Sequence, residues 1–257
     1  MALSRVLITG ASSGIGAALA QALAAPGITL HLGGRDAARL QAIAVDCRAR
    51  GAEVMIRPVS VTDAAAMRGW IMAAGPLDLV IANAGISAGT AGAVESEEQT
   101  RAIFATNLDG VLNTVLPAAE VMAGQKPDAA GVRGRIAAVA SIAGFIPGAM
   151  APAYCASKAA VDTWIVGAAP SMEARGILLT SLCPGFIETP MTAGNEFPMP
   201  GLMSPARAAG LMLRGIRAGR RRVAFPWWLA AAARLGALAP PRLRERLSTR
   251  LPAKKAL

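Results

Sequence analysis

The chain has 257 residues, of which 54% are hydrophobic and only 16% are charged, so it is long enough for one large α/β domain with a buried core. This balance excludes a disordered chain and a disulfide scaffold. The net charge of +10 lies at one end: residues 201–257 hold 13 Lys/Arg and one acid, whereas residues 1–200 hold 13 Lys/Arg and 15 acids. That asymmetry argues against a protein that binds nucleic acid over its whole surface.

The cysteines and the N-terminus predict a cytoplasmic protein without a metal site. Cys47, Cys155 and Cys183 have neither C-x-x-C spacing nor the spacing of a zinc site. The N-terminal residues lack the order of charged, apolar and cleavage regions that marks a secretory signal. We therefore expect three reduced thiols and no metal ligand.

Short apolar runs alternate with longer helix-like stretches along the chain. The predicted strands are residues 5–9, 28–32, 54–58, 77–82, 135–141 and 178–182, with 223–225 as a candidate seventh. The predicted helices are residues 16–25, 37–50, 63–74, 97–122 and 153–175. This alternation predicts a doubly wound, mostly parallel sheet of about seven strands, with helices on both faces, in a single domain.

Two stretches have no helical or strand period. Residues 124–134 predict a surface loop before the fifth strand. Residues 191–202 are rich in Met, Pro and Gly and are expected to form a mobile loop over a site.

A glycine-rich turn follows the first predicted strand and precedes the first predicted helix. Glycine lets the backbone turn sharply and approach a pyrophosphate closely, and the helix N-terminus offers free N–H groups and a positive dipole end. The strand–turn–helix context is the one that supports such a motif, although a tight turn alone could produce the pattern. The candidate phosphate-binding residues are Gly10, Ser12, Ser13, Gly14, Ile15 and Gly16.

The second predicted strand is followed by Gly33-Gly34-Arg35-Asp36. In a dinucleotide-binding fold, an acid here binds the ribose 2′-hydroxyl of NAD, whereas an arginine pairs with the 2′-phosphate of NADP. Arg35 lies about 20 residues after the last glycine of the turn, as that rule requires. The sequence therefore favours NADP(H) over NAD(H). The alternative is that Asp36 binds the ribose and Arg35 is only a solvated residue at a helix start.

Tyr154 and Lys158 stand four residues apart in a predicted helix, so their side chains share one face. A nearby ammonium is expected to lower the pKa of the phenol from its reference of about 10. That would make Tyr154, which is the only tyrosine in the chain, a usable acid or base near neutral pH.

Further candidates follow other strands at the same edge of the predicted sheet. Ser141 closes the fifth strand, where its hydroxyl could bind a substrate carbonyl, because the carboxyl ends of parallel strands face the ligand crevice. Asn107 lies in the helical stretch after the fourth strand. The remaining candidates at these strand ends are Asn83, Ala84, Gly85, Pro184, Gly185, Ile187 and Thr189.

These motifs, in this order, resemble those of the short-chain dehydrogenase/reductase family over residues 6 to about 191. The resemblance implies a Rossmann fold and NAD(P)-dependent hydride transfer between a carbonyl and an alcohol. It implies a proton donor at Tyr154, a lysine at Lys158 that holds the nicotinamide ribose, a substrate-orienting hydroxyl at Ser141, and a proton-relay and structural role for Asn107. A homodimer or homotetramer is also expected.

The resemblance places Ile187 and Thr189 at the nicotinamide end of the cofactor. Two positions depart from the family pattern. Ser60 stands where an aspartate near the adenine is common, which predicts weaker adenine binding. Pro170 interrupts the helix of Tyr154, but three turns downstream of the active face.

The C-terminal end is basic and apolar, and residues 221–257 are expected to extend the dinucleotide-binding and catalytic domain of residues 1–220. Trp227 and Trp228 stand beside an alanine/leucine stretch, and Leu243, Leu247 and Leu251 predict an amphipathic helix among arginines. Residues 220–251 could lie on an anionic membrane surface or pack against a sister subunit or the substrate pocket. Nucleic-acid binding has no supporting motif.

Other functions were weighed against the oxidoreductase. Residues 85–89 match the G-x-S-x-G pattern of serine hydrolases at Ser87, but the only histidine, His31, precedes the serine instead of following it. A non-catalytic redox sensor that binds NAD(P) would not need the Tyr154 phenol. An epimerase or dehydratase on the same scaffold would be expected to carry a second substrate domain.

The substrate is not legible from the sequence, but its expected surroundings are apolar. A hydrophobic ketone, aldehyde or secondary alcohol is the favoured substrate. The expected lining comprises Phe145, Ile146, Met150, Met191, Phe197 and Met199.

Overall fold

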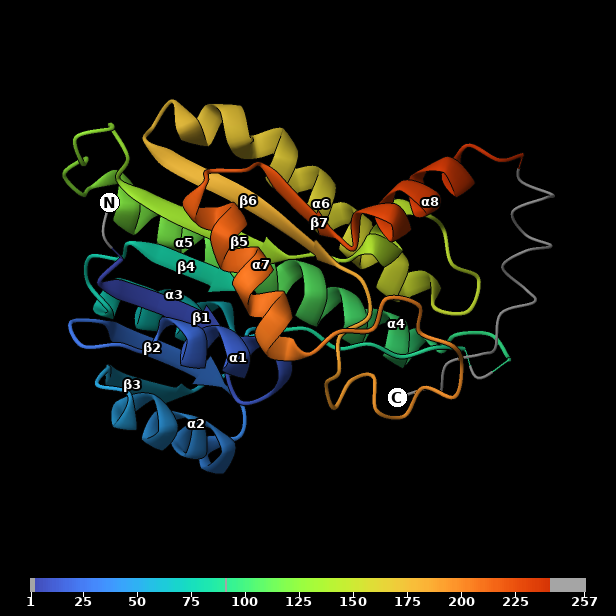
Figure 1. Cartoon of the computed structure of the whole chain (residues 1–257), viewed down its shortest axis with the longest axis horizontal. Helices are drawn as coiled ribbons and strands as arrows, with labels where there is room; N and C mark the ends of the chain where they lie inside the picture. The colour runs from blue at the N-terminus through green and yellow to red at the C-terminus, as the bar shows by residue number, and fades with distance from the viewer. Residues whose placement is uncertain (1–2, 91, 241–257) are drawn as a thin grey trace.

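A computed structural model describes residues 3–90 and 92–240 of the chain. Seven parallel strands form one sheet in the order β3-β2-β1-β4-β5-β6-β7 (Figure 1). The strands are β1 (Arg5–Thr9), β2 (Thr29–Gly34), β3 (Glu53–Pro58), β4 (Leu79–Ala82), β5 (Gly134–Val139), β6 (Ile177–Pro184) and β7 (Arg222–Phe225). The predicted doubly wound Rossmann sheet in a single domain is confirmed.

The central strands are buried along most of their length, which is why their sequences are nearly continuous apolar runs. All four residues of β4 are buried, as are the last four of β1. The edge strand β3 alternates instead, since only Val54 of its six residues is buried. The strand order reverses between β1 and β4, so a crevice is expected beyond the carboxyl ends of these two strands.

Helices cover both faces of the sheet. Leu19, Leu40 and Leu213 of α1, α2 and α7 share one buried apolar cluster, and Ile71, Val115 and Ile165 of α3, α5 and α6 belong to a second one. The helices are α1 (Gly14–Leu23), α2 (Ala37–Ala49), α3 (Ala64–Ala73), α4 (Glu97–Phe104), the π-helical turn η1 (Ala105–Asp109), α5 (Gly110–Ala123), the 3-10 turn η2 (Ile142–Phe145), α6 (Pro152–Glu173), α7 (Pro205–Arg217) and α8 (Trp227–Ala237).

Three details differ from the sequence-based expectations. The single helix expected over residues 97–122 is divided by η1, whose wider turn carries Asn107. Ser141 lies two residues beyond the end of β5, where it caps η2 by accepting a hydrogen bond from the Ala143 N–H. The helices α7 and α8 were not predicted.

The structure describes only part of the C-terminal segment for which the sequence made a prediction. The amphipathic helix expected around Leu243, Leu247 and Leu251 lies outside the described residues. Residues 191–202, for which a loop was predicted, contain turns and irregular backbone with no strand and no helix. Among the described residues, no helix is both long and apolar enough to cross a bilayer.

Candidate functional site

One cleft runs along the carboxyl edge of the sheet and collects nearly all the candidate residues. Gly16 and Asn107 are the two candidates that do not line it. Those that do are Gly10, Ser12, Ser13, Gly14, Ile15, Arg35, Asn83, Ala84, Gly85, Ser141, Tyr154, Lys158, Pro184, Gly185, Ile187 and Thr189.

The turn between β1 and α1 is built so that only glycine fits at its key positions. Gly10 and Gly14 have φ angles of +64° and +55°, in the left-handed region that favours glycine. Gly16 does not line the cleft, but a Cβ there would lie 2.2 Å from the Gly10 carbonyl oxygen. Ser13 caps α1 without a side-chain hydrogen bond to the helix, so it leaves the first backbone N–H groups to an anion in the cleft.

Asn83 fixes this turn from the end of the neighbouring strand. Its Nδ2 donates to the Thr9 carbonyl at 3.0 Å and to the Gly10 carbonyl at 3.1 Å. Its own N–H and that of Ala84 donate to the Thr9 hydroxyl. The contacts give Asn83 a structural part in the glycine-rich turn in addition to its place on the wall of the cleft.

The cleft continues to the end of β2, where its wall is basic. Arg35 is exposed there, and Arg39 of α2, which the sequence analysis missed, also lines the cleft. The Asp36 carboxylate caps α2 by accepting from the Arg39 N–H at 2.9 Å and from Arg39 Nε at 2.6 Å. These hydrogen bonds from Arg39 lower the pKa of Asp36. Asp36 therefore serves as the N-cap of α2 and is paired with Arg39.

Ser141 and Tyr154 both line the cleft. Burial raises the pKa of Tyr154, and a side-chain hydrogen bond with Ser141 opposes part of this rise. The direction is opposite to the one that the Tyr154/Lys158 spacing predicted. The prediction considered the ammonium alone and could not include the loss of solvent around the phenol.

Lys158 lines the same cleft, one helical turn after Tyr154. Its side chain is buried, and Nζ donates to the Val139 carbonyl at 2.7 Å. Burial lowers the pKa of Lys158 to about 8. A smaller fraction of this amine is therefore protonated near neutral pH than in an exposed lysine.

Asn107 acts behind the cleft wall. Its Oδ1 accepts from the Ile86 N–H at 2.8 Å, and its Nδ2 donates to the Ile86 carbonyl at 3.0 Å and to the Ser157 hydroxyl at 3.1 Å. The residue thereby joins the segment after β4 to α6, which carries Tyr154. This geometry fits the structural role that the resemblance implied.

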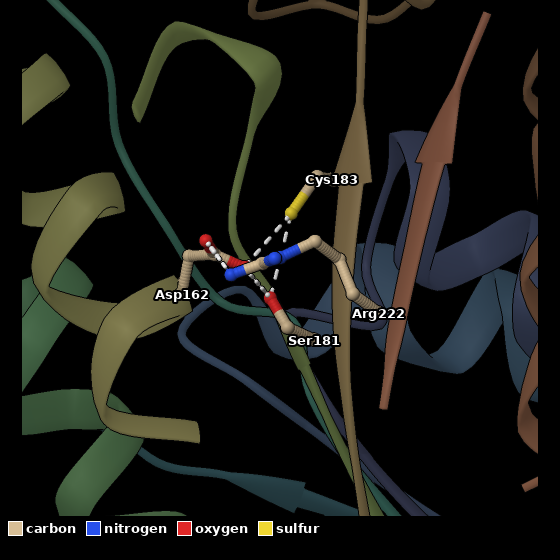
Figure 2. A network of polar contacts seen from close by, with 4 residues as sticks. All are labelled: Asp162, Ser181, Cys183 and Arg222. Atoms are coloured by element: carbon tan, nitrogen blue, oxygen red, sulfur yellow. Dashed lines mark hydrogen bonds and ion pairs between the residues drawn. The ribbon is translucent and has the colours of Figure 1, made fainter. Parts of the chain in front are cut away.

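A buried ion pair lies on the same helix, one turn beyond Lys158 (Figure 2). Asp162 accepts two hydrogen bonds of 2.8 Å from Arg222 of β7 and one of 2.7 Å from the Ser181 hydroxyl of β6. The guanidinium of Arg222 also lies 5.8 Å from the ring centre of Phe145 in η2. Burial of Asp162 opposes its ionisation, but the hydrogen bonds hold its pKa below the ordinary value. The pair ties the helix of Tyr154 to the sheet and to the segment that follows Ser141.

Comparison with known proteins identifies the family. The family model for short chain dehydrogenases matches residues 4–197. The chain belongs to the short-chain dehydrogenase/reductase family.

Relatives within the family are oxidoreductases. An uncharacterised oxidoreductase of Myxococcus xanthus is 37% identical over 98% of both chains. A putative ketoacyl reductase of the granaticin polyketide synthase of Streptomyces violaceoruber is 36% identical over 72% of this chain and 68% of its own. A short-chain dehydrogenase of Sphingobium yanoikuyae, solved with NADPH, has a TM-score of 0.80 at 27% identity and covers 96% of each chain. Membership of the family makes this chain an NAD(P)-dependent dehydrogenase/reductase.

The serine hydrolase alternative gains nothing from the placement of its residues. His31 lies in the middle of β2, in register with Leu7 of β1, which in turn pairs with Val80 of β4. Ser87 lies beyond the end of β4, several residues further along the chain. His31 is buried and its Nε2 has no hydrogen-bond partner among the described residues.

The expected substrate lining is only partly found in the cleft. Of the six apolar candidates, Met191 lines it. Phe145 is instead covered by guanidinium groups, with that of Arg234 at 4.3 Å from its ring centre. Phe197 packs edge to face on Phe186, with ring centres 6.0 Å apart. Residues that the sequence analysis did not name also line the cleft, including Val59, Val61, Ile86, Thr106, Pro190 and Thr192.

Proposed function

We propose that this family member is an NADP(H)-dependent reductase of apolar ketones or aldehydes, with Tyr154 as the proton donor. The observation that carries the proposal is the shared cleft: Ser141 and Tyr154 face the same cavity as the glycine-rich turn and the basic end of β2. A carbonyl group held at Ser141 would therefore lie between the proton donor and the nicotinamide end of a bound dinucleotide.

The residues of the cleft fit a dinucleotide phosphate. The turn from Gly10 to Gly16 has no room for a side chain at Gly16, and the start of α1 presents unbonded N–H groups to a pyrophosphate. Arg35, which is exposed on the cleft wall, would pair with the 2′-phosphate of NADP, and Arg39, whose Nε is bonded to Asp36, would add positive charge beside it. When bound, NADPH supplies the hydride for the reduction.

The protein's own part in the chemistry is to orient the carbonyl and deliver a proton. The hydroxyl groups of Ser141 and Tyr154 would donate hydrogen bonds to the carbonyl oxygen and polarise it. Because burial raises its pKa, Tyr154 holds its proton at neutral pH and can release it to the alkoxide that forms. Lys158, fixed by the Val139 carbonyl, would hold the nicotinamide ribose beside the phenol.

Relatives support a carbonyl substrate. Two are named as putative ketoacyl reductases of polyketide synthases, from Streptomyces violaceoruber and Streptomyces virginiae. A 3-oxoacyl-[acyl-carrier protein] reductase of Brucella melitensis has a TM-score of 0.74 at 26% identity. We infer a ketone on an apolar chain as the substrate class.

Parallel fluorescence titrations with NADPH and NADH test the cofactor half of the proposal without a substrate. The wild type should bind NADPH more tightly, and Arg35→Ser should lose about tenfold or more of that affinity while its affinity for NADH changes little. Arg57→Ser, a change at another arginine of the same sheet edge that does not line the cleft, is the control. Equal affinities for both cofactors in the wild type would refute the NADP preference.

Tyr154→Phe tests the catalytic half. The variant should bind NADPH with nearly unchanged affinity and lose turnover of a panel of apolar ketones. Retained turnover would refute the assignment of Tyr154 as the proton donor. If the wild type binds NADPH but reduces no carbonyl, a non-catalytic NADP-binding protein becomes the better description.

A further inference from the structure

The helix α8 presents an apolar stripe to solvent. Trp227, Leu235 and Leu238 are 78%, 69% and 82% exposed. With the exposed Ala231 they are spaced four, four and three residues apart, so they lie along one side of the helix. Trp228, at 43% exposure, borders the stripe.

The opposite side of α8 is held firmly against the domain. Ala230 is buried, and the Leu229 side chain lies against Gly185 at the end of β6. Gly236 approaches Ile146. Arg234, which flanks the stripe four residues before Leu238, reaches over the Phe145 ring. Figure 1 shows the helix projecting beyond the end of β7, at the margin of the molecule. The stripe is therefore an outward face of a docked helix.

The chain that leads on from this stripe is strongly basic in sequence. Residues 241–257, which follow it directly, contain six Lys/Arg and one acid. The arginines before α8 contribute less, because Arg221 and Arg222 are paired with Glu173 and Asp162 and Arg217 lies beside Leu3 at the other edge of the sheet. Whatever covers the stripe must tolerate a dense positive charge beside it.

We propose that α8 docks on an anionic membrane surface, with Trp227, Leu235 and Leu238 inserted at the boundary between headgroups and acyl chains. Tryptophan prefers this boundary, and each nearby Lys or Arg adds attraction to anionic lipid. A second copy of the chain suits the stripe less well, because a two-fold contact through α8 would bring two basic C-terminal ends together. With 11 residues, α8 is about 16 Å long and can lie on a bilayer but not cross it.

Co-sedimentation of the full-length protein with vesicles tests the proposal independently of catalysis. Vesicles of phosphatidylcholine with about one-third phosphatidylglycerol should bind the protein, pure phosphatidylcholine vesicles should bind it poorly, and added salt should weaken the binding. The double variant Trp227→Gln/Leu235→Gln should lower the partition coefficient about tenfold or more. Both side chains are exposed, so the fold should persist, which NADPH titration and circular dichroism can verify.

The matched control is Val94→Gln/Leu116→Gln, which removes two apolar side chains that are 93% and 50% exposed outside the stripe. This control should bind anionic vesicles as the wild type does. Equal binding to neutral and anionic vesicles, or no binding at all, would overturn the proposal. Wild-type binding by the stripe variant would also overturn it, because the basic residues alone would then be sufficient. Loss of an oligomer in that variant, seen by sedimentation velocity without any vesicle binding, would assign the stripe to a second copy.

Discussion

Two arginine–carboxylate pairs in this protein have hydrogen bonds of equal length and differ in burial. Arg222 donates to Asp162 at 2.8 Å and 2.8 Å, and Arg68 donates to Glu120 at 2.8 Å and 2.8 Å. The side chains of Arg222 and Asp162 are 33% and 8% exposed, whereas those of Arg68 and Glu120 are 55% and 52% exposed. The buried pair also accepts a hydrogen bond from Ser181, so it differs from the exposed pair in its loss of water and in this added support.

We predict that Asp162→Asn lowers the free energy of unfolding by about 2–4 kcal/mol. Removal of one partner of a fully buried pair costs about 3–5 kcal/mol, because the other charge stays buried and uncompensated. Arg222 keeps one third of its side chain exposed, so water compensates part of that loss. The Ser181 hydroxyl also keeps an acceptor in the asparagine. Glu120→Gln should cause a much smaller change, since water already screens both groups.

Equilibrium urea unfolding of the wild type and the two variants measures these free energies. Adding Arg222→Met to Asp162→Asn should recover part of the loss, because the unpaired guanidinium is removed. The wild type and Asp162→Asn should also converge at acid pH. Because the pKa of Asp162 is lower in the folded protein than its ordinary value of 3.8, the carboxylate stabilises the fold fully above pH 3.8. This stabilisation is lost as the pH falls through the folded-state pKa. An Asp162→Asn loss no larger than that of Glu120→Gln would refute the reasoning.

The remaining predictions concern the phosphate turn, a buried histidine and the phenol. Gly16→Ala should reduce NADPH affinity about tenfold or more, because the added Cβ must displace the turn. Gly167→Ala, which lies in open space on α6, should keep that affinity and stabilise the protein by about 0.5–1 kcal/mol. NADPH titration measures the affinities, and urea unfolding measures the stabilities. Burial and the charge of Arg5 lower the pKa of His31 below 6.5. Below pH 6.5 the imidazole is therefore protonated more readily in the unfolded chain than in the folded one, and the free energy of unfolding decreases. His31→Leu should remove this part of the loss when unfolding is compared at about pH 5.5 and about pH 7.5. For Tyr154, carbonyl reduction should keep its rate across the neutral range and fall only at high pH, as measured by the pH profile of kcat/KM.

The sequence predicted that the glycine-rich turn, Ser141, Tyr154 and Lys158 lie at one sheet edge, because this depends on short-range spacing and on where parallel strands end, and the structure brings them into one cleft. Arg39 was missed for the opposite reason. Its place on the cleft wall follows from how α2 packs beside the end of β2, which no local pattern expresses. The part that Asp36 plays as the N-cap of α2 does have a local signal, because an aspartate directly before a helix typically accepts a hydrogen bond from the N–H three residues later, here that of Arg39.

The helix α7 did leave a signal in the sequence. Ser204 and Pro205 form a typical helix start, and Ser204 accepts from the Arg207 N–H. The buried residues Ala208, Ala209, Met212, Leu213 and Ile216 then follow a helical period. By contrast, the interruption of α4 and α5 by η1 depends on tertiary contacts of Asn107 with Ile86 and Ser157.

Burial of the phenol bears on which direction of the reaction suits this site. Reduction needs a protonated donor at the start, and a Tyr154 whose pKa lies above its ordinary value near 10 supplies one at every neutral pH. Oxidation of an alcohol needs the phenolate of Tyr154, which burial disfavours. Lys158, whose pKa is about 8 and whose Nζ donates to the Val139 carbonyl, stabilises that phenolate only weakly. We therefore expect oxidation to rise steeply with pH while reduction stays level. An oxidation rate that peaks near neutral pH would mean that the ammonium outweighs burial in the working complex, and that the pKa of the phenol falls when cofactor and substrate occupy the cleft.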